Sequence, residues 1–184
     1  MTRLVYCLVA GVLWVSPSSA MTVERAESFF ENDEYSVELR VVLHAPPERV
    51  AAVLKDYANY THLDASILES KVLERTSTDT VLLYTKLRAC TGLFCRTVKR
   101  VERVQERPLE LFAEVIPERS DVTSGHTHTV LQAVEGGTRV HYRTGVAVKF
   151  WVPVFIGRPL MLRRLRETSS DLFRRVEARA QAGS

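Results

Sequence analysis

The sequence predicts an α+β fold in which a curved antiparallel sheet of seven strands packs around a long C-terminal helix. An alternating apolar segment is followed by two short helical segments, six further strand-like segments follow in series, and one amphipathic helix ends the chain. Short turns join the six later strands and no long helix interrupts them, which disfavours a parallel βαβ arrangement. A single antiparallel sheet is therefore the expected core.

The composition is that of an ordinary globular protein, with 46% hydrophobic and 26% charged residues in a chain of 184. These proportions exclude a disordered chain, a collagen-like repeat and a multi-span membrane protein. The formal net charge of +3 is too small to indicate a nucleic-acid partner. We therefore expect one domain and no nucleic acid.

The first twenty residues, 1–20, have the layout of a secretory signal peptide. Arg3 supplies the positive start, residues 4–15 are an unbroken apolar run, and Ser18 and Ala20 are the small residues expected before a cleavage site. As a membrane anchor the run is too short, because twelve residues in a helix span about 18 Å of a hydrocarbon core about 30 Å thick. We expect cleavage after Ala20 and a soluble exported protein, periplasmic in a Gram-negative source or otherwise secreted.

The next segments are interpreted from their periodicity. Residues 21–33 are polar and acidic without a steady period, and we expect a loose or helical lead-in to a domain over 34–181. Apolar and polar residues alternate over 35–43, which is typical of a half-buried strand. Pro47 then favours the first turn of a helix, and a second short helix is expected at 60–63.

The six later strands are bounded by turn signals rich in Gly, Pro, Asp and Thr. They are predicted at 67–75, 79–89, 94–105, 109–116, 124–134 and 138–149. In the last hairpin, Gly136 and Gly137 are the expected central residues, which pairs Leu131 with Tyr142. Side-chain alternation then puts this pair inside the sheet and the histidines outside. Those histidines are His126, His128 and His141.

Cys90 and Cys95 flank an expected tight turn at Gly92 between two predicted strands. Two thiols that face each other across such a turn suit a disulfide, and an exported protein meets an oxidising environment. A metal pair is the weaker interpretation, because no nearby His or Cys completes a four-ligand set. We expect a structural disulfide.

Three stretches carry a resemblance to a known superfamily. They are LHAPPERV with VLKDYANY over 43–60, GGTRV at 136–140 and RPL at 158–160. They resemble the START-like (SRPBCC) superfamily, and within it the polyketide cyclase/dehydrase and coenzyme Q-binding groups, over about residues 35–180. The resemblance implies the helix-grip fold, with a space between sheet and helix that holds a lipid, sterol, quinone or polyketide.

Residues that face inward in the predicted pattern are expected to line that space. They are apolar or carry a hydroxyl, and apolar walls with a few oriented polar groups describe a small-molecule pocket. The candidates are Leu83, Thr85, Leu87, Thr127, Thr129, Leu131, Tyr142, Thr144, Val146, Met161, Leu165, Thr168, Ser169 and Leu172. For any single hydroxyl, a bond to neighbouring backbone in a filled core is the competing interpretation. Thr127 stands where many relatives carry an aromatic side chain, which implies a more polar wall there.

Tyr142 is the only ionisable side chain among these candidates, and no catalytic constellation is identified. His62 and Asp64, two residues apart in a loop, resemble an acid–base pair, but a plain surface location is the simpler interpretation. The three histidines of the last hairpin face outward, with no carboxylate to complete a metal site. We therefore expect no catalytic residue, no metal and no cofactor.

The final helix, predicted over 158–180, is amphipathic and basic. Its apolar arc faces the sheet, while seven arginines against three acidic residues, Glu177 among them, leave a local net charge of +4. A solvated face is the ordinary explanation of such a run. Transient contact with a membrane surface during ligand exchange is the alternative.

Together these features predict an exported protein that binds, and in one version transports, an apolar small molecule such as a lipid, quinone or polyketide. The first alternative is a cyclase or dehydratase acting on a polyketide-like substrate, which the scarcity of inward acids and bases disfavours. The second is a protein-interaction module, and the export signal argues against a cytoplasmic target for it.

Overall fold

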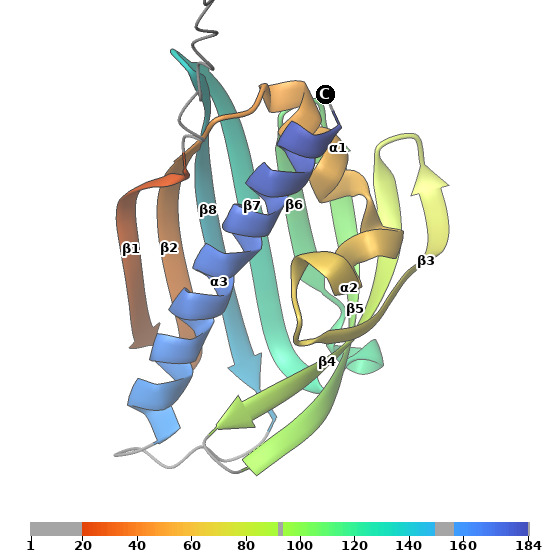
Figure 1. The fold of residues 1–184 in the computed structure, drawn as a ribbon. Helices are drawn as coiled ribbons and strands as arrows, with labels where there is room; N and C mark the ends of the chain where they lie inside the picture. The colour runs from red at the N-terminus through yellow and green to blue at the C-terminus, as the bar shows by residue number, and fades with distance from the viewer. Residues whose placement is uncertain (1–19, 92–93, 150–156, 184) are drawn as a thin grey trace, which may run out of the picture.

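A computed structural model describes residues 20–91, 94–149 and 157–183 of the chain (Figure 1). Within these ranges, eight strands form one antiparallel sheet in the order β1-β2-β8-β7-β6-β5-β4-β3. The strands are β1 (Thr22–Glu31), β2 (Glu34–Leu43), β3 (Ile67–Ser77), β4 (Thr80–Thr91), β5 (Phe94–Arg107), β6 (Glu110–Val115), β7 (Val122–Val134) and β8 (Gly137–Val148). The predicted signal peptide up to residue 19 and the predicted turn at Gly92 lie outside the described residues.

The helices lie on the concave side of the sheet. They are α1 (Pro47–Lys55), η1 (Tyr57–Asn59), α2 (Tyr60–Leu63) and α3 (Gly157–Ala182), and a further short turn, η2 (Pro117–Arg119), follows β6. Pro47 opens α1 as the preceding motif predicted. Figure 1 shows α3 crossing the sheet diagonally, with α1 and α2 beside its C-terminal part. No helix in the described ranges is both long and apolar enough to span a membrane.

The predicted α+β class is confirmed, but the strand count of seven was wrong by one. The segment expected as a loose or helical lead-in forms the edge strand β1, paired with β2 from Thr22 to Glu31. Its alternation is weak because the half-buried positions are Ala26, Ser28 and Phe30, only one of them large and apolar. The turn that creates the hairpin is Asn32-Asp33, both with positive φ, at 51° and 60°. Asn and Asp adopt that conformation more readily than most residues, so this dipeptide was the missed signal.

The main core lies between β2 and the C-terminal half of α3. Alternate β2 residues, including Val37 and Leu43, are fully buried, as are Phe173 and Val176 of α3. Burial of an apolar side chain of this size contributes about 1.5–3 kcal/mol to the free energy of folding. The inward arc predicted for the final helix therefore anchors that helix to the sheet.

The register predicted for the last hairpin was wrong by two residues. Val134 pairs with Gly137, so Glu135 and Gly136 are the central residues, and Leu131 pairs with Val140 rather than Tyr142. Gly137 belongs to the strand because a Cβ there would lie 2.0 Å from the Leu43 carbonyl oxygen, a contact that only glycine permits. A shift of two preserves the face of every side chain, so the inside and outside assignments still hold.

Glu177 does not belong to the solvated face of the final helix, where the charge count had placed it. Glu177 is only 6% exposed. Its carboxylate accepts hydrogen bonds from the backbone nitrogens of Met21 and His44, both at 2.8 Å. The acidic side chain thus fastens the end of α3 to the start of β1 and the end of β2.

Candidate functional site

The predicted ligand-contacting residues lie on the inner side of the sheet and on α3, but in two environments. Six are buried among core residues: Leu83, Thr85, Thr129, Leu131, Thr144 and Ser169. Eight are half-buried: Leu87, Thr127, Tyr142, Val146, Met161, Leu165, Thr168 and Leu172. We call these eight the half-buried zone. Tyr142, Leu165 and Leu172 of this zone pack against the main core, and Leu87 and Val146 pack against a smaller cluster around Val98.

An ion pair lies on the same inner face of β5. Arg100 and Glu102 stand opposite Thr85 and Leu83 of β4, and Arg100 Nε lies 3.0 Å from Glu102 Oε2. The Glu102 side chain is 4% exposed and that of Arg100 is 26% exposed. A carboxylate at this depth is stable only when it is paired, because desolvation of a lone charge is costly. The inner face of the sheet therefore carries one positive and one negative side chain.

Two tyrosines share the electrostatic environment of this ion pair. Burial raises the pKa of the Tyr60 phenol, and the nearby Glu102 carboxylate raises it further. Burial also raises the pKa of Tyr142, which the hydroxyls of Thr144 and Ser169 and the charge of Arg100 partly offset. Both phenols therefore stay protonated at neutral pH. Tyr60 already donates its proton to the Leu54 carbonyl, so Tyr142 is the phenol that can donate to a bound molecule. We call Tyr60, Arg100, Glu102 and Tyr142 the inner polar cluster.

The neighbouring hydroxyls are ordered by hydrogen bonds. Thr144 Oγ1 donates to the His126 carbonyl at 3.0 Å and lies 2.9 Å from Thr127 Oγ1. Because the proton of Thr144 is used on the carbonyl, Thr127 is the donor of the shorter bond. Ser169 Oγ donates to the Leu165 carbonyl at 2.8 Å. Thr144 and Ser169 therefore each donate to a backbone carbonyl, and each oxygen keeps acceptor capacity.

Thr85 differs from these hydroxyls. It is 1% exposed, and its Oγ1 has no hydrogen-bond partner among the described residues. Buried hydroxyls are rarely left unpaired, because the unmade bond costs free energy. Thr85 pairs with Arg100 across the two strands, so its unsatisfied hydroxyl lies next to the inner polar cluster.

Three members of the inner polar cluster were not predicted from the sequence. Tyr142 was the only ionisable residue among the predicted inward side chains, and the structure adds Tyr60, Arg100 and Glu102. The face of β5 was ambiguous because both sides carry buried valines, Val104 inside and Val101 outside. The available signal was the spacing. Arg100 and Glu102 lie between the inward valines Val98 and Val104, at intervals of two residues, and so share their face of the strand.

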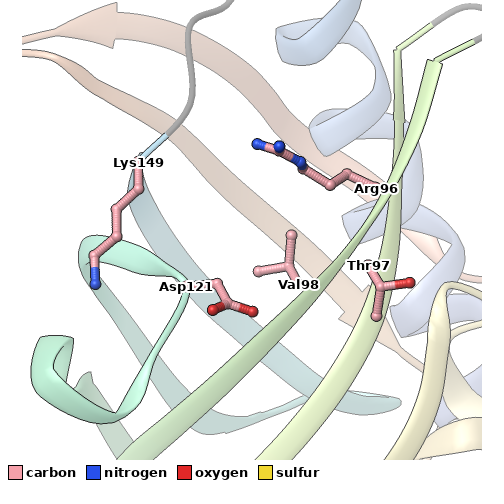
Figure 2. Close-up of a pocket in the computed structure, with 5 residues that line it drawn as sticks. All are labelled: Arg96, Thr97, Val98, Asp121 and Lys149. Atoms are coloured by element: carbon pink, nitrogen blue, oxygen red, sulfur yellow. The ribbon is translucent and has the colours of Figure 1, made fainter.

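A hollow of about 320 Å³ lies at the end of the sheet where β8 ends and β5 begins. Figure 2 shows that Arg96 and Lys149 flank it with Val98 between them. Lys149 Nζ is held by the carbonyls of Pro117 and Ser120, at 3.0 and 2.7 Å. Val98 belongs to a small core cluster against which Leu87 and Val146 of the half-buried zone pack. This hollow is therefore the point where solvent approaches that zone.

A larger hollow, about 500 Å³, lies on the outer face of β2, β8 and β7. Its walls include the charged side chains Glu38, Arg40 and Arg143 and the imidazoles of His128 and His141. A shallow depression with charged walls is a poor match for an apolar ligand. The inner face is the better candidate.

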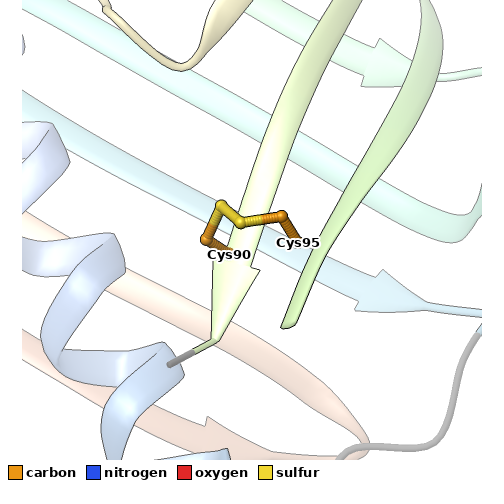
Figure 3. Close-up of a disulfide and its surroundings, with 2 residues drawn as sticks. All are labelled: Cys90 and Cys95. Carbon is orange, nitrogen blue, oxygen red and sulfur yellow. A yellow bond between two sulfur atoms is a disulfide. The ribbon is translucent and has the colours of Figure 1, made fainter. Parts of the chain in front are cut away.

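The expected disulfide is confirmed. Cys90 on β4 and Cys95 on β5 are directly opposed in register, and their sulfur atoms are bonded (Figure 3). The bridge closes the β4–β5 hairpin near the hollow that Arg96 flanks. It thereby holds together two strands that carry residues of the half-buried zone and of the inner polar cluster.

The other sequence candidates do not assemble into a site. His62 is exposed, and Asp64 accepts a hydrogen bond from the backbone nitrogen of Ser66 at 2.8 Å, an ordinary turn contact. The histidines of β7 pair with separate carboxylates, His126 with Glu34 and His128 with Glu110. In the described parts of the chain, no three His, Cys, Asp or Glu side chains are placed to hold a metal ion.

Several arginines of α3 have partners within the chain. Arg163 pairs with Glu167 and Arg174 with Asp171, both on the exposed side. Arg158 lies 4.0 Å from the centroid of the Phe30 ring, a cation–π contact that joins the start of α3 to β1. These contacts account for part of the basic run without a membrane, and contact with a membrane surface stays a prediction.

The comparisons with known proteins agree with this geometry. The sequence model of the family described as "Polyketide cyclase / dehydrase and lipid transport" matches residues 34–181. A search of the curated proteins finds no match.

Solved structures show the same fold. An aromatase/cyclase, Zhui, from Streptomyces sp. R1128 has a TM-score of 0.66 at 13% identity, covering 80% of this chain and 94% of its own. A START superfamily protein from Mycobacterium smegmatis has a TM-score of 0.64 at 17% identity, covering 81% and 99%. A STAR-related lipid transfer protein from Xanthomonas axonopodis has a TM-score of 0.62 at 12% identity, covering 89% and 99%. The helix-grip fold expected from the sequence is confirmed.

Proposed function

The chain belongs to the family of polyketide cyclases, dehydrases and lipid transport proteins, and on this basis we propose that it is an exported protein that binds an apolar small molecule. The body of the ligand lies in the half-buried zone between the sheet and α3. Its polar end reaches the inner polar cluster. The single observation that carries this proposal is the Arg100–Glu102 pair on the inner face, in which Glu102 is buried and Arg100 half-buried, next to two protonated phenols.

The donors of the inner polar cluster define the polar end of the ligand. Arg100 can only donate hydrogen bonds, and the protonated phenol of Tyr142 is a second donor, whereas Tyr60 already donates to the Leu54 carbonyl. A hydroxyl, carbonyl or carboxylate oxygen accepts such bonds. We therefore propose a lipid, quinone or polyketide whose polar end carries an acceptor oxygen.

The binding energy comes from the apolar body of the ligand. Removing about 300 Å² of apolar ligand surface from water contributes roughly 7 kcal/mol, at about 25 cal/mol per Å², before the cost of association. Groups such as Leu87, Leu165 and Leu172 can supply that contact because solvent still reaches them. The oriented polar groups then add selectivity rather than most of the affinity.

Two features support export. The residues before Met21 have the signal-peptide layout, and the Cys90–Cys95 bridge belongs to an oxidising compartment. A transporting role would require release as well as binding. The hollow beside Arg96 and Lys149 is the proposed way in and out of the half-buried zone.

The experiment is native mass spectrometry with organic extraction on protein exported through its own leader in a Gram-negative host. We expect an apolar molecule to copurify. Arg100→Met removes the cation from the inner face, and Arg103→Met is its matched control, because Arg103 is exposed on the outer face of the same strand. We expect at least a tenfold loss of bound molecule in Arg100→Met and no change in Arg103→Met.

An empty, folded protein would contradict the binding proposal, and so would equal retention in Arg100→Met and Arg103→Met. The mass of the extracted molecule identifies its class directly. Since the structure fixes only the acceptor character of the polar end, this measurement also separates lipid, quinone and polyketide.

A second candidate function is an enzyme acting on a polyketide-like substrate. It is favoured by the position of a carboxylate, a guanidinium and two phenols on one inner face, since acid–base chemistry needs such groups around a bound substrate. An enzyme would release an altered molecule. Incubating the extracted ligand with fresh protein and with Tyr142→Phe, and comparing masses over time, separates conversion from simple binding.

A further inference from the structure

A buried carboxylate links the C-terminal helix to the first residue of the folded domain. Glu177 Oε2 accepts a hydrogen bond from the Met21 backbone nitrogen at 2.8 Å. Its other oxygen, Oε1, accepts one from the His44 backbone nitrogen at 2.8 Å and lies 3.1 Å from His44 Nδ1. Gln181 Nε2, one turn further along α3, donates to the His44 carbonyl at 3.1 Å. This end of the helix is therefore built around Glu177.

Within the described residues, this carboxylate is held by two backbone N–H donors and one imidazole. Its side chain is 8% exposed, and the His44 imidazole is its only ion-pair partner there. Two arginines of the same helix pair with other acids, Arg163 with Glu167 and Arg174 with Asp171. A buried carboxylate is stabilised mainly by a positive charge or by charge-assisted hydrogen bonds. A cation at the Met21 nitrogen would supply both.

The position of Met21 in the sequence is what makes that cation available. The small residues Ser18 and Ala20 end the signal-peptide pattern, which predicts cleavage of the Ala20–Met21 bond. Strand β1 begins at Thr22, immediately after it, and Ala20 is exposed. The predicted cleavage point therefore lies one residue before β1.

We propose that removal of the leader places the new α-ammonium group of Met21 on the buried carboxylate of Glu177, so that processing completes an ion pair that locks β1 to α3. Hydrolysis adds one water across the Ala20–Met21 bond. Ala20 leaves with a carboxylate, and the Met21 nitrogen becomes a protonated amine. The atom that was an amide donor at 2.8 Å becomes a cationic donor at the same place.

The arrangement of the fold explains why one ion pair has this effect. Figure 1 shows that the start of β1, the end of β2 and the C-terminal end of α3 lie at the same end of the sheet. In the described sheet β1 is the edge strand next to β2, so its first residues depend on contacts such as this one. The ion pair would stabilise the processed domain over its precursor. The inference rests on the export part of the proposed function.

The test is a double-mutant cycle between the N-terminus and residue 177. One chain is released from a fusion so that Met21 is its first residue, and a second carries Gly-Ser before Met21. Each is made with Glu177 intact and as Glu177→Gln. We expect the free N-terminus to raise the midpoint of thermal unfolding by about 3–6 °C with Glu177 intact, and by nothing in Glu177→Gln.

Glu167→Gln is the matched control, because Glu167 is an exposed acid on the same helix. It should leave the difference between the two N-termini unchanged. If Glu177→Gln does not fold, acetylation of the Met21 amine in the unmutated chain removes the charge instead, and it should lower the midpoint to that of the extended chain. Equal midpoints for free, extended and acetylated chains would overturn the proposal.

The intact mass of the exported protein tests the processing step. A mass that begins at Met21 supports the proposal, and any other first residue overturns it. Bound ligand is measured in the same samples. Loss of ligand with an intact coupling to Glu177 would contradict only the binding proposal, so the two failures are distinguishable.

Discussion

Tyr142 on β8 lies edge-on against Phe173 of α3, with 5.1 Å between the ring centroids. The two rings mark a boundary on the inner face. Phe173 is completely buried in the main core, whereas Tyr142 is half-buried and carries its hydroxyl beside Thr144 and Ser169. The contact thus fixes the helix to the sheet at the point where the sealed core gives way to the candidate site.

Phe173→Ala should be among the most damaging substitutions in the chain. Removing a buried ring leaves a cavity that the surrounding structure fills only in part, and we expect a loss of about 3–5 kcal/mol in the free energy of unfolding. Leu68→Ala is the control, because Leu68 is 45% exposed and should change stability by less than about 0.5 kcal/mol. Denaturant unfolding measures both. A loss below about 1 kcal/mol for Phe173→Ala would contradict this account of the core.

Glu102→Gln should destabilise the protein by leaving Arg100 without its counter-charge. The loss in the free energy of unfolding would be larger if the unpaired arginine were fully buried. Because Arg100 is a quarter exposed, we expect a loss of about 2 kcal/mol. Adding Arg100→Met to Glu102→Gln should recover part of that loss, because no unpaired charge then remains. Chemical denaturation of the single and double variants checks this. A double variant that is less stable than Glu102→Gln would show that the pair is not the cause.

Three tyrosines should resist ionisation at alkaline pH. Burial raises the pKa of Tyr57, Tyr60 and Tyr142 above the ordinary value, and for Tyr57 the hydrogen bond to Glu106 adds to the effect. In the unfolded chain a phenol ionises near pH 10, so the stability that depends on their protonated form is complete below about pH 10 and is lost as the pH rises beyond it. Absorbance at 295 nm should show these groups titrating only with unfolding. Three phenols ionising normally in the folded state would contradict the prediction.

The two glycines of the last hairpin should respond differently to alanine. At Gly137 a Cβ would lie 2.0 Å from the Leu43 carbonyl oxygen, so Gly137→Ala must displace backbone and we expect a loss of more than about 2 kcal/mol. At Gly136, with φ of +80°, nothing lies near the new Cβ. Gly136→Ala therefore meets only backbone strain of about 1 kcal/mol. Thermal unfolding of both variants gives the order, and the reverse order would contradict the observed register.

The disulfide should contribute modestly to stability, and it should leave the exported protein without a free thiol. It closes a short loop, with Cys90 and Cys95 separated by five positions, for which chain entropy gives about 2 kcal/mol. We expect the Cys90→Ser, Cys95→Ser double variant to lose no more than that. Labelling of the exported protein without reductant should detect no free thiol. Two labelled thiols per chain would show that the bridge does not form.

Local patterns were enough to predict most of the elements. Alternation located β2, the turn residues bounded β3 to β8, and the amphipathic period of the final helix located α3, because each signal depends only on residues close together in the chain. The Cys90–Cys95 pair was predictable for the same reason, since both thiols belong to one hairpin.

The sequence by itself thus determined the α+β class, the inward faces of the last hairpin and of α3, and the disulfide. Only the tertiary structure decided the contacts between distant segments. Gly137 pairs with Val134, and at this position the Leu43 carbonyl, far away in sequence, occupies the space that a side chain would need. The inner polar cluster exists because the fold brings Tyr60 and Tyr142 to the face of β5 that carries Arg100 and Glu102. Glu177 is buried because β1 and β2 bring their backbone donors to it, and no local period records the approach of another strand.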